Sequence, residues 1–422
     1  MIENIDQINL QDTKKININK SFLYFIFAGM FLSVVLSSSS TFFSYVDEMI
    51  TLLLIVYLLN RLIYSQLLRV NFIILFMIFI LIISGILGLA ISGIERSLFE
   101  VLVDIITTVK PFVFFVSTIQ ICHKMHKNFL KKFLRKSAKI ALIVFFLLFI
   151  FNLFSSGIFS NETFLGLKNF RLFGFAGNFG ILVFSLFGIV LEKNTNIFKS
   201  LYFWITLILV LFTFKAQAVF FIITFVIFYI YFKFSNRLKL RWIIPIFLLV
   251  LPSMLPKILN YFNTTSYSPR KIILTDGLNI LINYFPLGSG LATFGSPIAA
   301  QSFSPIYTSL GYFRYFGMGL DGELDFLNDN FLSAIIGQFG VFGIFMYCCI
   351  IVYLLKLLLL KNEKSILSVF NVSSVISLFS TTIASSFFSA PVGCFLFGVI
   401  AVNYIIESEN INGKSFLRNY DC

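Results

Sequence analysis

Basic residues beside apolar segments are the residues of this chain best suited to chemistry. Four of them border apolar runs or lie in the polar stretch 257–329: Arg171, Lys215, Arg270 and Lys271. Guanidinium groups offer a planar fork to phosphate oxygens, and ammonium groups a compact point charge. Preorganised cations of this kind can neutralise a departing diphosphate without a metal ion. Asp329, just before another apolar run, can act as the general base that takes a proton from a hydroxyl group.

Each of these residues also has a structural alternative. A basic side chain near membrane depth can extend along its stem to the interface, or pair with Asp276, Glu162 or a lipid phosphate. Asp329 can simply cap the helix that follows it, where a carboxylate satisfies free amide groups and the helix dipole. Other carboxylates stand close by in the sequence and could serve as the base instead: Asp321, Glu323 and Asp325.

The elements that must position these residues are membrane helices. The chain has 422 residues, of which 58% are hydrophobic and only 12% charged, about half the charged share of a soluble domain. Apolar runs of roughly 20 residues each predict an all-α polytopic membrane protein with about twelve transmembrane helices. The predicted segments are 21–44, 46–60, 70–91, 98–121, 138–155, 172–191, 200–214, 217–233, 242–256, 330–355, 365–386 and 390–406.

The distribution of basic residues predicts the orientation of these helices. Most of the 32 Lys and Arg fall on one side when the segments alternate from a cytoplasmic N-terminus, as the positive-inside rule requires. Both termini are then cytoplasmic, and the stretch 257–329 is a large extracytoplasmic loop between the ninth and tenth helices. The net charge of +13 is therefore a topology signal and indicates no nucleic-acid partner. The four cations named above lie near the outer leaflet, against that signal, which favours a functional role.

Within the predicted loop, Pro286-Leu287-Gly288-Ser289-Gly290 has the composition of a turn. Gly288 and Gly290 allow another backbone to approach closely. The segment is not a nucleotide-binding loop, because no GxxxxGK[ST] pattern occurs and the segment faces away from cytoplasmic ATP.

Metal and cofactor sites are not expected. The two histidines, His123 and His126, stand in a Lys-rich segment at a spacing too short for a zinc-binding helix. None of the five cysteines falls in the long loop, which argues against a thiolate metal site or a disulfide framework there.

Taken in order, these motifs resemble the O-antigen polymerase and ligase superfamily of bacterial envelopes. Arg171…Gly174…Asn178 resembles its Arg-Gly-Asn signature, and Phe212-Thr213-Phe214-Lys215 resembles its TxSR turn with Lys in the Arg position. The other two elements are similar as well: Arg270…Pro286-Leu287-Gly288-Ser289-Gly290…Phe294, and Asp329-Asn330-Phe331-Leu332…Gly337…Gly340…Gly343. The resemblance covers roughly 165 to 350. Asp329 stands where ligases of the superfamily carry histidine, which favours a polymerase.

The resemblance implies a metal-independent glycosyltransferase of the bacterial cytoplasmic (inner) membrane that needs no cofactor. It would polymerise oligosaccharide repeat units linked to undecaprenyl diphosphate into a surface polysaccharide, such as O-antigen of lipopolysaccharide or capsule. Arg171, Lys215, Arg270 and Lys271 would hold the donor diphosphate, and Asp329 would orient or deprotonate the acceptor hydroxyl. Asp329 and Arg270 would thus be the catalytic residues. A lipid-linked oligosaccharide flippase and a chain-length regulator are the protein partners it implies, alongside membrane lipid.

Two alternatives remain. A ligase that transfers finished glycan to another acceptor would share the fold and the chemistry. A flippase or other transporter would normally show internal repeats and binding groups near the bilayer midplane. We see no repeat between the halves, but Asp104 and Lys110-Pro111, within an apolar segment, are transporter-like features.

Overall fold

The computed structural model describes residues 20–36, 43, 45–123, 125, 127–154, 163–164, 167–192, 196–235, 238, 245, 268–324, 326–361 and 365–407. This part of the chain is helical, apart from a two-residue antiparallel pair, β1 (Thr163–Phe164) with β2 (Leu167–Lys168). A first helix covers Lys20–Leu36. The longer helices are α3 (Val46–Ile63), α4 (Arg69–Ser92), α5 (Leu98–Cys122), α6 (Lys127–Phe154), α7 (Ala176–Val190), α8 (Leu201–Leu211), α9 (Ala216–Ser235), α12 (Pro269–Asn283), α15 (Phe331–Lys361), α16 (Ile366–Thr381) and α17 (Pro391–Glu407). The short ones are η1 (Ile197–Lys199), α13 (Pro297–Gln301), α14 (Pro305–Ser309) and η3 (Tyr312–Arg314).

Each predicted apolar segment within the described residues contains a helix, whereas 242–256 lies almost entirely outside them. Four boundaries were wrong. Helix α15 ends at Lys361, six residues after the predicted end at 355. Helix α6 begins at Lys127 instead of 138, because its lysines continue the helix on an exposed face. Helix α7 begins only at Ala176, so Arg171 lies in the turn before it. Helix α16 ends at Thr381, five residues before the predicted end.

Within the described part of the chain, four helices are long and apolar enough to cross a membrane: Arg69–Ser92, Lys132–Phe154, Ala216–Ser235 and Phe331–Leu359. Helices α7 and α8 are apolar but have 15 and 11 residues, fewer than the roughly 20 that a bilayer core requires. The protein is thus a helical, multi-pass membrane protein. The total of twelve crossings and their direction stay predictions.

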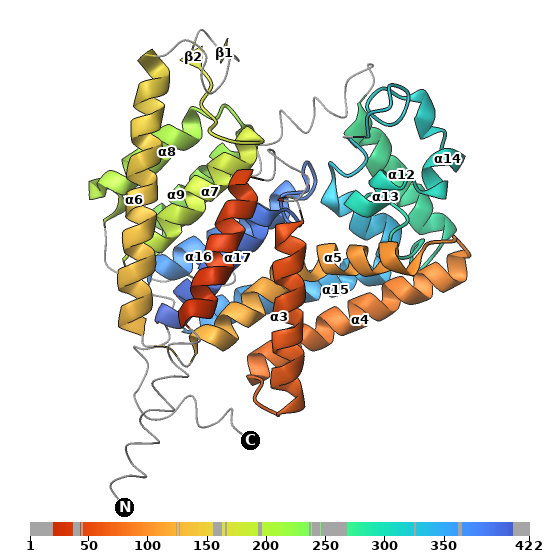
Figure 1. Cartoon of the computed structure of the whole chain (residues 1–422), viewed down its shortest axis with the longest axis horizontal. Helices are drawn as coiled ribbons and strands as arrows, with labels where there is room; N and C mark the ends of the chain where they lie inside the picture. Colours follow the sequence, from red (N-terminus) through yellow and green to blue (C-terminus); the bar gives the residue numbers. More distant parts are fainter. Residues whose placement is uncertain are drawn as a thin grey trace, which may run out of the picture.

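The described helices form two packed regions with separate hydrophobic cores. The larger is the bundle of long helices, with a phenylalanine-rich core. The smaller, which we call the 268–330 unit, has a core of its own that includes Ile273, Phe294, Tyr307 and Tyr312. Figure 1 shows this unit, with α12, α13 and α14, beside the bundle and against α4, α5 and α15. The described part of the predicted loop, from residue 268 on, is therefore a small folded unit on the bundle.

The segment 382–390, which we call the connecting segment, joins α16 to α17 and is fixed by aromatic packing. Phe388 is 2% exposed, and its ring lies 5.1 Å from Phe331 of α15 and 5.4 Å from Phe112 of α5. In a bilayer, where lipid is as apolar as a leucine, close packing of this kind replaces the hydrophobic effect as the force between helices. Each aromatic pair adds about 0.5–1.5 kcal/mol. The connecting segment is thus held firmly between α5 and α15.

Candidate functional site

Arg270 and Asp329, the two residues predicted to be catalytic, form an ion pair in the structure. Arg270 is the second residue of α12, and Pro269 before it has the fixed φ that suits a first helical position. Its Nη2 donates to Asp329 Oδ2, and each side chain is a little over a quarter exposed, 28% and 27%. The pair forms because α12 packs along α15. Two residues that are 59 positions apart in the sequence are thus in direct contact.

The alternative that Asp329 caps α15 is wrong. Asn330 Oδ1 accepts a hydrogen bond of 3.1 Å from Ser333 N, so the asparagine does the capping. The alternative pairing of a cation with Asp276 is not seen for Arg270. Asp276 instead accepts a hydrogen bond of 2.9 Å from the Tyr312 hydroxyl. Glu162 and Asp325 lie outside the described residues.

Lys271 follows Arg270 and is exposed. Successive residues of a helix do not share a face, so Lys271 and Arg270 point in different directions from α12. Of the two, only Arg270 is paired with Asp329.

Arg171 and Lys215 lie in two turns that contact each other. Phe170 N donates to Phe212 O at 2.9 Å, which joins the turn before α7 to the turn between α8 and α9. Arg171 is half-buried and Lys215 is exposed. The two predicted phosphate-binding motifs thus come from neighbouring turns, although 44 positions separate their cations in the sequence.

The connecting segment relates these turns to the Arg270–Asp329 pair. On one side, Gln217 Nε2, two residues after Lys215, donates to Ala384 O at 2.8 Å. On the other side, Leu332 N, three residues after Asp329, donates to Thr382 O at 3.1 Å. The starts of α9 and α15 therefore meet the same short segment. Lys215 and the Arg270–Asp329 pair are thus both close in sequence to residues that contact this segment, whereas their common depth in the membrane stays a prediction.

The glycine motif of the 268–330 unit is buried against the bundle. Ser289 N and Gly290 N donate to Gly337 O and Gln338 O of α15, at 2.8 and 2.9 Å. Those carbonyls are free because α15 is broken at Gly340, where φ is 61° and ψ is −152°.

No side chain would fit at these glycines. A Cβ at Gly290, where φ is 91°, would lie 2.1 Å from Leu89 N, and a Cβ at Gly288 would lie 2.5 Å from Gly337 O. The predicted close backbone approach is confirmed, and its partners are helices α4 and α15 of the protein itself.

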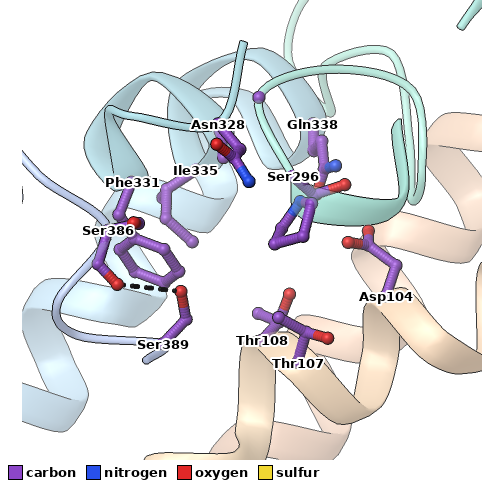
Figure 2. Close-up of a pocket in the computed structure, with 13 residues that line it drawn as sticks. Asp104, Thr107, Thr108, Ser296, Asn328, Phe331, Ile335, Gln338, Ser386 and Ser389 are labelled. Carbon is purple, nitrogen blue, oxygen red and sulfur yellow. Dashed lines mark hydrogen bonds between the residues drawn. The ribbon is translucent and has the colours of Figure 1, made fainter. Parts of the chain in front are cut away.

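A narrow pocket lies where α5, the 268–330 unit, the start of α15 and the connecting segment meet (Figure 2). The space open to a water-sized molecule is about 10 Å³, roughly room for one water. Several polar residues border it, although most of the surface that faces the space is apolar. The described residues of its lining include no basic residue: Asp104, Thr107, Thr108, Gly295, Ser296, Pro297, Asn328, Phe331, Ala334, Ile335, Gln338, Ser386 and Ser389. Asn328 directly precedes Asp329, so the pocket adjoins the ion pair along the chain.

Asp104 is the only ionisable residue of this lining and is fully buried, at 0% exposure. Its Oδ2 accepts a hydrogen bond of 2.7 Å from Ala292 N of the 268–330 unit. Its Oδ1 accepts none of hydrogen-bond geometry from the described residues, although Ser296 and Gln338 lie near the carboxylate. The start of α5 is fixed by a capping box between Ser97 and Glu100, which helps to hold Asp104 in register.

From the sequence, Asp104 was only a transporter-like feature, and this pocket was not predicted. One signal was available. Thr107 and Thr108 follow Asp104 at spacings of three and four, which places all three on one helix face.

Lys110, the other transporter-like residue, is buried at a different place. Its Nζ donates to Asp47 Oδ2 and, at 2.9 Å, to Glu48 Oε1. Both carboxylates stand in the first turn of α3, where the helix dipole also favours negative charge. This trio is an ion-pair cluster that joins α3 to α5.

Among the described residues, no group of three or more His, Cys, Asp and Glu side chains is arranged to hold a metal ion. Metal-independent chemistry stays a prediction.

Comparison with known proteins adds no family. No protein-family model matches the sequence, and no curated protein matches it. The resemblance to O-antigen polymerases thus rests on the ordered motifs, two of which the structure joins through the Arg270–Asp329 pair.

Proposed function

We propose that this protein polymerises lipid-linked oligosaccharide repeat units at the outer face of the bacterial cytoplasmic membrane. The chain held on undecaprenyl diphosphate is the donor, and the terminal sugar of a new repeat unit is the acceptor. The observation that carries the proposal is the gathering of Lys215 and the Arg270–Asp329 pair around the connecting segment. Arg171, half-buried in the turn joined to that of Lys215, adds a third cation.

A diphosphate is the ligand that such a site suits. It carries several negative oxygens, and its charge grows as the bond to the sugar breaks, so fixed cations stabilise the departing group more than the bound substrate. Arg270 is held by Asp329, which orients its guanidinium, and a guanidinium is a planar donor group suited to phosphate oxygens. Lys215 and Lys271 are exposed, as residues that meet a mobile lipid headgroup must be.

The test is deletion of the gene followed by separation of surface glycans on a silver-stained gel. Loss of the polymer ladder, with single repeat units still attached to the lipid acceptor, supports the polymerase. Loss of all attached glycan, with long polymer accumulating on undecaprenyl diphosphate, would mean a ligase instead.

Charge variants then test the site in the same strain. Arg270→Ala and Arg171→Ala should abolish the ladder at normal protein level, and Lys215→Gln should shorten it. Lys233→Gln is the matched control, because Lys233 is also exposed but lies in the last turn of α9, whereas Lys215 immediately precedes the first. Undiminished chain length in both arginine variants would refute the assignment of the site.

A flippase is the second candidate, favoured by the buried cluster of Lys110 with Asp47 and Glu48. Ionisable groups inside membrane helices often mark a transport path. If the protein is a flippase, its deletion would leave repeat units trapped on the cytoplasmic side. The gel, together with labelling that shows on which side of the membrane the lipid-linked sugar is accessible, distinguishes this result from loss of polymerisation.

A further inference from the structure

We propose that the pocket of Figure 2 receives the attacking hydroxyl group of the acceptor sugar, and that Asp104 is the base that accepts its proton. This inference rests on the proposed function and assigns the role of base to a residue other than Asp329.

The lining of the pocket indicates a neutral, hydroxyl-bearing ligand. Threonine and serine hydroxyls and the amides of Asn328 and Gln338 surround a single carboxylate, and no basic residue is present. A phosphate would be repelled there, because its charge has the sign of Asp104 and no cation among the lining residues would offset it. A sugar hydroxyl can donate to the carboxylate and accept from the amides and hydroxyls.

The size of the pocket agrees with this. Room for about one water molecule accommodates a hydroxyl group but excludes a sugar ring. Phe331, Ile335 and Pro297 supply apolar surface beside the polar groups, where the C–H face of a sugar ring at the mouth can pack.

The hydrogen bonding of Asp104 suits a general base. One oxygen is held by Ala292 N at 2.7 Å, which fixes the orientation of the carboxylate. The other oxygen accepts no hydrogen bond of good geometry from the described residues and is buried beside the pocket. A buried carboxylate oxygen without a donor is costly, so a ligand hydroxyl that donates to it is bound favourably.

Asp329 is less suited to the same task. It is already the ion-pair partner of Arg270 and does not line the pocket. Its role in the site is then to position Arg270 for the diphosphate.

The pocket also lies where the acceptor must lie. Ser386 and Ser389 of the connecting segment form one wall, and the same segment bonds Gln217, next to the turn of Lys215. Asn328 on another wall precedes Asp329, the partner of Arg270. The acceptor hydroxyl would thus approach from between the two groups of cations.

In the step itself, the acceptor oxygen forms a bond to the anomeric carbon of the donor sugar, and the bond from that carbon to the diphosphate oxygen breaks. The electron pair of the broken bond goes to the diphosphate, whose charge the cations offset. The proton of the hydroxyl goes to Asp104 Oδ1 and from there to water.

The test uses the purified protein in lipid nanodiscs, with undecaprenyl diphosphate-linked repeat units extracted from the deletion strain as substrate. Asp104→Asn preserves the size of the side chain and an acceptor for Ala292 N but cannot take the proton. We expect its polymerisation rate to fall by about 10²–10⁴-fold, the usual contribution of a general base. Its binding of undecaprenyl diphosphate should stay within twofold of wild type, whereas Arg270→Ala weakens that binding.

Two further variants separate catalysis from structure. Asp329→Asn should be slower but should keep the loss of rate on acidification that wild type shows, because Asp104 still titrates. Thr108→Val, which removes one pocket hydroxyl, should raise the KM for the acceptor more than it lowers kcat. Asp276→Asn is the matched control, since Asp276 bonds Tyr312 and does not line the pocket.

The outcomes separate this inference from the proposed function. If wild type elongates the lipid-linked units and Asp104→Asn does so within threefold of its rate, Asp104 is not the base, while the polymerase assignment stands. If the rate of Asp329→Asn no longer fell on acidification, the role of general base would likewise move to Asp329. If wild type elongates nothing, the proposed function fails, and this inference fails with it.

Discussion

Helix α5 carries two buried charged residues that differ in how their charges are paired. Lys110 is bonded to two carboxylates of α3, and its side chain is 4% exposed. Asp104, six residues earlier and 0% exposed, has no cationic partner within hydrogen-bonding distance, and only one of its oxygens is bonded. The same helix thus contains one charge that the fold compensates and another that it leaves half satisfied.

The difference separates structure from function. A buried ion pair contributes little net stability, but removing one partner is costly because the other is left unpaired. Asp104 has no such ion pair among the described residues, and its hydrogen bond from Ala292 N joins α5 to the 268–330 unit. The Lys110 cluster therefore fits a structural role, and Asp104 the binding role proposed above.

The largest effect on stability is expected at Lys110. Lys110→Met removes the cation and leaves two carboxylates unpaired beside α5, which should cost roughly 3–5 kcal/mol. Thermal unfolding in detergent measures the loss, and Asp104→Asn is the comparison variant on the same helix. The triple change that adds Asp47→Asn and Glu48→Gln should recover most of it, because no charge then remains. An unchanged midpoint for Lys110→Met alone would show that the cluster is not structural.

A backbone change should affect the Asp104 pocket and leave the Lys110 cluster unchanged. Gly290→Ala places a Cβ 2.1 Å from Leu89 N at a positive φ, so the 268–330 unit must shift on α4. Overpacking of this kind costs roughly 1–3 kcal/mol. Ala292, two residues on, would move with it and lose its hydrogen bond to Asp104.

We therefore expect Gly290→Ala to reduce activity as well as the unfolding midpoint, and to leave the Lys110 cluster intact. Gly93→Ala is the control, because it also has a positive φ, 66°, but open space around it. Equal activity loss in the two variants would show that backbone strain alone, and not contact with α4, is responsible.

Much of the helical layout could be predicted from the sequence. Long apolar runs permit few other structures in a membrane, so helices such as α4 and α15 begin within a residue of the prediction. The predicted start of α6 was wrong because charged residues belong to the helix there. Its lysines precede the apolar run but are part of the helix, since lysine is a good helix former.

The site was harder to predict, for physical reasons. Arg270 and Asp329 were each identified, but their ion pair depends on how α12 packs along α15. Asp104 belongs to no motif, and its pocket is completed by Ser386 and Ser389, far along the chain. Local sequence patterns report on helices, whereas a pocket built by four elements is a property of their packing.

Asp104→Asn should have a small effect on stability, in contrast to its effect on rate. The asparagine oxygen can still accept from Ala292 N, so the change in unfolding free energy should be within about 1 kcal/mol, the value of one hydrogen bond. Thermal unfolding of Asp104→Asn, measured alongside that of Lys110→Met, checks this. If the two variants were equally destabilised, both charges would be structural and the contrast along α5 would disappear.

The smallest effect is expected at a third carboxylate, Asp276 of α12, which is bonded to a neutral partner. Burial raises its pKa, although the hydrogen bond from Tyr312 opposes this. Because the folded pKa exceeds the unfolded one, near 3.9, the group favours the fold below the unfolded pKa. That contribution is lost as the pH rises through the folded pKa. The midpoint of wild type relative to Asp276→Asn should therefore fall as the pH rises from 4 towards neutrality. A difference that instead grew over this range would mean that the ionised Asp276 is the form the fold prefers.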